Sequence, residues 1–310
     1  MTGQLSEMRL LMIGAMYENG GNTTQRFLDG HPEMFVYPFE SQLGTRFVQD
    51  ALTSVCPVKY RWPVFALDAT PREDYFAIID EECKVRARTP HVSKFRDAQF
   101  DFSDDDRRAR YEARVAANGR SRSQNVDAFF RATRDAWTNY CHRGEPQVWV
   151  GYSPNAVFDA AKILTDFPHG HVLHVVRNPW SAYADTKKRP VPLSLPSYML
   201  LWTLNQYFAR LYEAQFPGRV HIVRIEDVMA DPTAILGSVC RSIGVETGRS
   251  LEQPSWNGVP LSQVYPWGTI RVPTTEVNRA TAFELSSDEQ TAVRQAAGPY
   301  LDALNYGDYL

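Results

Sequence analysis

The chain has 310 residues, of which 44% are hydrophobic, so it can bury a sizeable core in one large domain. Its 33 Lys and Arg residues against 36 Asp and Glu residues give a net charge of −3, which argues against broad binding of nucleic acid or anionic membranes. No apolar run reaches the length of a membrane span and no signal-peptide pattern is present, so we expect a soluble, cytoplasmic protein.

The cysteines follow neither a CxxC pattern nor any other metal-ligand spacing, so we expect free, buried thiols in a reducing compartment. They are Cys56, Cys83, Cys141 and Cys240.

The first predicted elements are a strand, a glycine-rich turn and a helix. Leu10–Gly14 is an apolar run of strand length, residues 18–24 are rich in glycine and small polar residues, and residues 25–29 have helical character. Backbone N–H groups in such a turn and in the first turn of the helix converge on one point, to which Thr23 and Thr24 add hydroxyl groups. The stretch therefore predicts an anion-binding cradle.

The cradle does not have the sequence of a nucleotide-binding P-loop. It lacks Gly-Lys-Ser/Thr, and no lysine occurs between Met1 and Val58. A nucleotide kinase or ATPase would lack its charged centre here.

A second strand is predicted at Met34–Tyr37, and Glu40 follows its end. Parallel sheets place their ligands at this edge, so Glu40 is a candidate functional carboxylate. A helix is expected over residues 44–52, whereas residues 53–80 give no clear pattern.

Residues 80–145 are predicted to form a helical insertion that covers one end of the sheet. Ser103 and the acids after it are a helix start signal, and that helix should end near Asn118-Gly119. A second helix is expected over residues 125–142, where apolar side chains recur at helical spacing.

The rest of the chain alternates strands and helices, which indicates an α/β fold with a three-layer arrangement of helices around a parallel sheet. Strands are expected at residues 147–150, 171–176 and 220–223, and helices at 153–164, 197–216, 231–243 and 286–304.

The histidines do not form a metal site in this interpretation. His169, His171 and His174 have no carboxylate partner close in sequence, so structural or surface roles are favoured, and His31 is expected to pack in a turn. The charged run at residues 224–227 is compatible either with a cofactor contact or with a structural ion pair.

Four stretches, in order, resemble the sulfotransferases that use 3′-phosphoadenosine 5′-phosphosulfate (PAPS). They are the strand-GGNTT-helix-LDGHP stretch near the N-terminus, FPHGHVLHVVRNP, VHIVRIEDVMADP and ELSSDE. The resemblance implies the P-loop NTPase-like sulfotransferase fold, as a single domain over residues 1–310 with the helical insertion at about 80–145.

The same resemblance implies roles for individual residues. The loop of Gly20, Gly21, Asn22, Thr23 and Thr24 would hold the 5′-phosphosulfate. Arg177 would bind the 3′-phosphate, with Ser181 nearby, and Glu40 matches a carboxylate general base. A C-terminal cofactor loop would include Trp267, Gly268, Thr269 and Arg271, the last as a second contact to the 3′-phosphate.

The chain departs from the family pattern just before the loop. Members usually carry Lys or Arg there, whereas this chain has Tyr17-Glu18-Asn19. A serine usually follows the 3′-phosphate arginine by one or two helical turns, where Asp185 and Thr186 stand here. The substitute cation stays open among Arg26, Arg46, Lys94 and the basic run of residues 187–189.

The implied reaction is in-line transfer of a sulfuryl group from PAPS to a hydroxyl of a small molecule, such as a secondary metabolite, lipid or carbohydrate, with 3′,5′-adenosine bisphosphate (PAP) as product. Glu40 is either the base or a solvated, helix-capping carboxylate. Aromatic stretches at residues 60–76 and 126–140 belong either to the core or to an acceptor site for a flat or apolar molecule.

Two alternatives remain: a non-catalytic PAPS- or PAP-binding protein of the same fold, and a nucleotide-dependent small-molecule kinase. The sequence leaves the oligomeric state open, a homodimer included.

Overall fold

The computed structural model describes residues 5–41, 43–45, 48–55, 60–66, 68–93, 95–141, 144–261 and 275–310. Its centre is a five-stranded parallel sheet with the strand order β2-β3-β1-β4-β5. The strands are β1 (Leu10–Gly14), β2 (Met34–Val36), β3 (Val148–Tyr152), β4 (His171–Val176) and β5 (Val220–Arg224). All five predicted strands are present, and the α/β prediction is confirmed.

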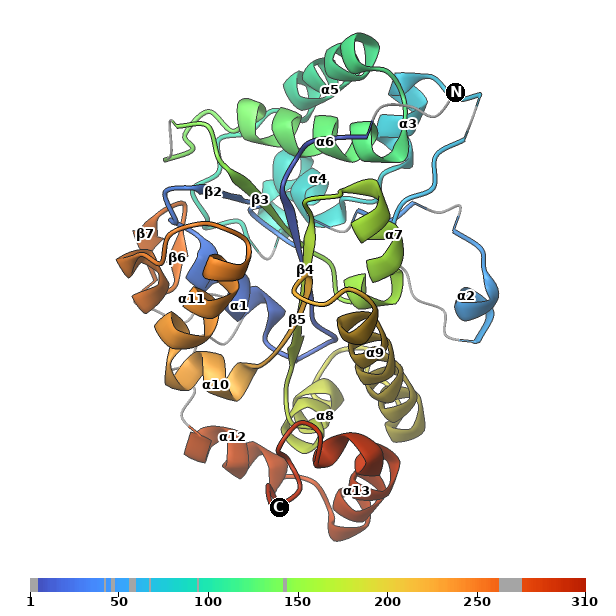
Figure 1. The fold of residues 1–310 in the computed structure, drawn as a ribbon, viewed down its shortest axis with the longest axis vertical. Helices are drawn as coiled ribbons and strands as arrows, with labels where there is room; N and C mark the ends of the chain where they lie inside the picture. The colour runs from blue at the N-terminus through green and yellow to red at the C-terminus, as the bar shows by residue number, and fades with distance from the viewer. Residues whose placement is uncertain are drawn as a thin grey trace.

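Both faces of the sheet are covered, as a parallel sheet requires. Along β1, Leu11 and Ile13 pack into one core cluster while Leu10 and Met12 pack into another, because successive side chains point to opposite faces. Helices α1 (Gly21–Leu28), α10 (Ile225–Ala230) and α11 (Pro232–Ser242) lie on one side in Figure 1. Helices α7 (Ala160–Asp166) and α9 (Leu195–Gln215) lie on the other.

Between β2 and β3 the chain is mostly helical. It contains α2 (Ala51–Val55), α3 (Pro71–Ala77), α4 (Glu81–Arg88), the 3₁₀ turn η1 (Pro90–Val92), α5 (Asp104–Asn118) and α6 (Arg122–Ala136). Ser103 caps α5 as expected, and Gly119 ends that helix with a φ of 86°. Helix α6 stops six residues before the predicted end, because Trp137 leaves the helix and pairs with Phe102 in an isolated antiparallel bridge.

The helix expected over residues 44–52 is wrong in its first part, because none of the described residues between 44 and 50 is helical. Thr45 instead pairs with Ile78 in an antiparallel bridge, and its hydroxyl exchanges two hydrogen bonds with the backbone of Val64. A threonine hydroxyl that satisfies backbone groups in this way competes with helix formation. Helix starts only at Ala51.

The remaining elements follow β3. They are η2 (Ala156–Asp159), α8 (Pro179–Lys187), η3 (Arg249–Glu252), the β6–β7 hairpin (Ser255–Trp256 and Val259–Pro260), α12 (Thr275–Ala282) and α13 (Ser287–Leu301). Helices α12 and α13 lie at the opposite end of the molecule from α5 and α6 (Figure 1). None of the helices in the described ranges combines the length and apolar character needed to cross a bilayer.

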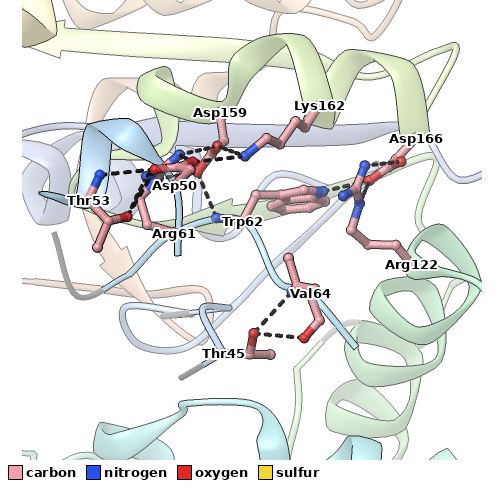
Figure 2. Close-up of polar contacts among 10 residues, drawn as sticks. All are labelled: Thr45, Asp50, Thr53, Arg61, Trp62, Val64, Arg122, Asp159, Lys162 and Asp166. Carbon is pink, nitrogen blue, oxygen red and sulfur yellow. Dashed lines mark hydrogen bonds and ion pairs between the residues drawn. The ribbon is translucent and has the colours of Figure 1, made fainter. Parts of the chain in front are cut away.

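A buried ionic cluster holds the segment after β2 against the sheet layer. The Arg61 guanidinium donates to both carboxylate oxygens of Asp159 at 2.7 Å and also pairs with Asp50 (Figure 2). The indole of Trp62 donates to Asp166, which also pairs with Arg122 (Figure 2). The cluster joins Asp50, Arg61 and Trp62 to η2, α7 and α6.

A second cluster is centred on Arg107 of α5, which is fully buried. Its guanidinium bonds Asp80, Asp104 and the hydroxyl of Tyr75, and Tyr37 at the end of β2 donates to Asp80. The arginine and the two carboxylates offset the cost of burying one another's charges. Helices α4 and α5 are thereby tied to the edge of the sheet that carries Glu40.

Of the cysteines, Cys83 and Cys240 are buried as expected. Cys141 is exposed instead, because it lies in the surface loop between α6 and β3, and Cys56 lies outside the described residues.

Candidate anion-binding and active site

Two glycines shape the loop between β1 and α1. Gly20 has a φ of 89°, and a Cβ there would lie 2.4 Å from Cγ1 of Ile225. A Cβ on Gly21 would lie 2.5 Å from the ring of Tyr152. The backbone is therefore pressed against the ends of β3 and β5, and the N–H groups of the first turn of α1 have no partner within the helix. This geometry suits an anion.

Asn19 fastens the loop to the neighbouring strand. Its side chain is 1% exposed, accepts the backbone N–H of Arg177 at 2.9 Å and donates to the carbonyl of Tyr17 at 2.7 Å. The two positions predicted to bind the two ends of one ligand, the loop and Arg177, are thereby held together. Sequence reasoning missed this role because Asn19 and Arg177 are 158 residues apart.

Arg177 follows β4, and three groups fix its guanidinium. Nε donates to the side chain of Asn278 at 2.8 Å, and Nη1 donates to the carbonyl of Glu18 and to Asp185. Asp185, which stands where the family pattern has a serine, is thus an ion-pair partner of the arginine.

Ser181 is fully buried in the first turn of α8, and its hydroxyl donates to the carbonyl of Asn278 at 2.5 Å. Arg177 and Ser181 therefore meet at one residue of α12. Asn278 was not predicted, since nothing in its local sequence marks it. The predicted loop residues Trp267, Gly268, Thr269 and Arg271 lie outside the described residues.

Glu40 lies beside the start of α1, where Asn22 Nδ2 is 3.4 Å from Glu40 Oε1. The backbone on both sides of Glu40 is fixed. The buried side chain of Gln25 donates to the carbonyl of Phe39 at 2.8 Å, and the N–H of Ser41 donates to the carbonyl of Tyr152. Gln25 was also missed, because its partners become visible only when α1 packs on the segment after β2.

A second carboxylate stands on the rim of the loop. Glu18 has a φ of 58°, unusual for a residue with a side chain. Burial raises the pKa of Glu18, although Arg189, the next largest influence, lowers it. The negative charges of Asp185 and Glu40 act in the same direction as burial, which places both carboxylates within electrostatic reach of Glu18.

The family model for the sulfotransferase family matches residues 20–249, which include the loop, Glu40 and Arg177. The chain belongs to the sulfotransferase family. No curated protein matches it at a significant level of sequence similarity.

A solved sulfotransferase domain shares its fold. The sulfotransferase domain from the curacin biosynthetic pathway is 14% identical and superposes with a TM-score of 0.58, covering 96% of this chain and 98% of the other. The sulfotransferase domain of the Synechococcus PCC 7002 olefin synthase is 16% identical, and the match covers 96% of this chain and 91% of that domain. The sulfotransferase STF9 from Mycobacterium avium is 14% identical, and the match covers 96% of this chain and 77% of STF9. Their TM-scores are 0.46 and 0.47, so the fold comparison rests on the first.

The basic residues that were candidates for the missing loop cation of this sulfotransferase have different surroundings. Arg26 is 2% exposed, lies 4.9 Å from the centroid of the Trp256 ring and donates to the carbonyl of Tyr37, so it serves the core. Arg46 and Lys94 lie outside the described residues. In the basic run, Lys187 pairs with Glu289 and Lys188 with Asp185 and Glu284, whereas Arg189 reaches Glu18.

The histidines of the sulfotransferase have structural surroundings. His31 is buried in the turn after α1, where its ring forms a hydrogen bond of 2.8 Å with the carbonyl of Glu246. This position agrees with the packing role expected for it. His174 bonds Gln206, and His171 stacks on His221 of the neighbouring strand. Within the described residues, no group of three or more potential metal-ligating side chains gathers.

Proposed function

We propose that this sulfotransferase transfers a sulfuryl group from PAPS to a hydroxyl of a small-molecule acceptor and releases PAP. The observation that carries the proposal is the pairing of two anion-binding positions at one sheet edge. One is the glycine loop, whose backbone lies too close to Ile225 and Tyr152 for a Cβ at Gly20 or Gly21, and the other is the guanidinium of Arg177. PAPS is an adenosine nucleotide with anionic groups at both its 5′ and its 3′ ends.

The loop residues would hold the 5′ end. The N–H groups of Gly21 and Asn22, at the start of α1, would donate to it, while Thr24 stabilises the turn by donating its hydroxyl to the carbonyl of Gly20 at 3.1 Å. Thr23 is partly exposed and would add a hydroxyl donor. When bound, PAPS supplies an activated sulfuryl group, and fixed donors favour charge that develops on its phosphate.

Arg177 would hold the 3′-phosphate. Its guanidinium fork suits a phosphate, and the bonds to Asn278, Asp185 and the Glu18 carbonyl fix its orientation in advance. Ser181 supports the same corner through Asn278.

Glu40 would accept the proton of the acceptor hydroxyl. A general base needs a fixed position, and the hydrogen bonds at Phe39 and Ser41 restrain the backbone around it. The rings of Tyr75, Phe129 and Trp137 are buried in the main core cluster, so those aromatic stretches contribute packing. The acceptor would approach from the side of Glu40 and the half-buried Tyr60.

Transfer is tested by incubating the protein with PAPS and a panel of phenols, alcohols and sugars and measuring acceptor-dependent release of PAP. We expect release by the wild type, and a loss of about 10²-fold or more in kcat for Glu40→Gln with PAP affinity retained. Glu213→Gln is the matched control, because that carboxylate lies on α9 and pairs with Arg210 away from the cradle.

Two results would redirect the proposal. Tight PAP binding without transfer to any acceptor favours the non-catalytic binding protein, for which the acidic Glu18 beside the loop is the supporting observation. A product labelled from ATP with Mg²⁺ would favour the kinase and contradict the proposal.

A further inference from the structure

Arg189, a basic residue just after the end of α8, lies beside the proposed anion-binding loop. Arg189 follows this helix and its backbone N–H bonds the carbonyl of Thr186. Its guanidinium carbon lies 4.5 Å from the centroid of the Tyr17 ring, and Nη1 lies 3.5 Å from Oε1 of Glu18. Arg189 thus contacts Tyr17 and Glu18, two of the three residues that stand where the family usually carries a loop cation.

The neighbouring cations are more firmly committed. Arg177 is held by three hydrogen-bond partners, Lys188 bridges two carboxylates, and Lys187 lies 2.6 Å from Glu289. Within the described residues, the one carboxylate paired with Arg189 is Glu18, at a distance typical of a loose surface pair. Such pairs are weak, so Arg189 can exchange its partner at little cost.

Glu18 is held in place by its backbone. Arg177 donates to its carbonyl, and its φ of 58° fixes the direction in which the side chain leaves the loop. The Glu18 carboxylate therefore lies beside the proposed anion-binding loop and carries a negative charge there. Without a nearby cation it would repel a phosphosulfate.

We propose that Arg189 is the loop cation of this sulfotransferase, which pairs with Glu18 until the 5′-phosphosulfate of PAPS displaces that carboxylate. The inference rests on the proposed function and assigns one more cofactor-contacting residue to the same site. An arginine fork can pair with phosphate or sulfate through two parallel hydrogen bonds, which a loose carboxylate pair does not use.

The test measures PAPS and PAP affinity by titration calorimetry for Arg189→Ala, Glu18→Gln and the double variant. We expect Arg189→Ala to weaken PAPS binding by about tenfold or more, since a charge-assisted contact is lost. Glu18→Gln should tighten PAPS binding several-fold, and the gain should be smaller when Arg189 is also replaced, because Glu18 then no longer competes with PAPS for the guanidinium. Lys187→Ala, from the same basic run, should leave the affinity within about twofold of wild type.

Melting temperatures without ligand check that the variants fold, which the 39% exposure of the Arg189 side chain favours. If the wild type binds PAPS and Arg189→Ala binds it equally well, the assignment of Arg189 is wrong and the proposed function stands. An equal gain from Glu18→Gln with and without Arg189 overturns the exchange of partners. If the wild type binds neither PAPS nor PAP, the proposed function fails and the inference fails with it.

Discussion

At Gly21 the loop that we propose as the anion-binding site packs on the ring of Tyr152, and no side chain fits between them. Gly21→Ala should therefore force the loop away from β3, weaken PAP binding by about tenfold or more, and lower the free energy of unfolding by roughly 1–3 kcal/mol. Gly144→Ala is the control, because nothing lies within 4 Å of a Cβ there. PAP affinity and urea denaturation measure both effects. Wild-type affinity in Gly21→Ala would show that the loop is not the binding surface.

Individual residues also show which parts of the candidate site could be predicted from the sequence. Gly20 and Gly21 stand out as glycines in the turn between a predicted strand and a predicted helix, and Glu40 and Arg177 stand out because each follows the end of a predicted strand. Asn19, Gln25 and Asn278 act through partners that only the folded chain brings close, so nothing in their local sequence marks them. Arg26 illustrates the reverse: a cation near the loop in sequence is enclosed by the core.

At the scale of elements, the Arg61 cluster joins the segment after β2 to η2 and α7 (Figure 2). Arg61→Ala leaves the buried carboxylate of Asp159 with Lys162 as its remaining ion-pair partner among the described residues. We predict a loss of about 3 kcal/mol in the free energy of unfolding, as for a buried pair broken on one side.

Urea denaturation measures this loss. Arg210→Ala is the control, since Arg210 pairs with Glu213 on the surface of α9 and its removal should cost less than about 1 kcal/mol. Equal losses in the two variants would contradict a structural role for the Arg61 cluster.

Strands were predicted better than the elements between them. Strands β1, β2 and β3 are short, nearly continuous apolar runs, because both faces of the sheet are buried there. The helix expected over residues 44–52 failed because Thr45 has partners at Val64 and Ile78, which a local pattern does not contain.

For the whole molecule, the buried His174 and the partly buried His171 make stability depend on pH. Burial lowers the pKa of His174 to about 4, and burial followed by the charge of His221 lowers that of His171 to about 4. The unfolded value is about 6.5, so between these values the unfolded chain binds more protons. Their contribution is complete above about pH 6.5 and is lost as the pH falls towards 4, at up to about 1.4 kcal/mol per pH unit for each histidine.

The slope is measured by urea denaturation at intervals between pH 7 and pH 4. His174→Gln should reduce it by about the share of one histidine. His169→Gln should leave it unchanged, because that side chain is 62% exposed. A slope that is the same in all three proteins would show that His174 is not buried in its neutral form.

The central claim, that one sheet edge binds both ends of PAPS, is tested most directly by comparing the affinities of PAP and AMP, which differ by the 3′-phosphate. We predict that the wild type binds PAP far more tightly than AMP or ATP. At one hundred times its Kd, PAP should add about 2.7 kcal/mol to the free energy of unfolding, seen as a higher melting temperature. Arg177→Ala should lose this preference while Arg210→Ala keeps it. Equal shifts with PAP and AMP, or a larger shift with ATP, would contradict the account.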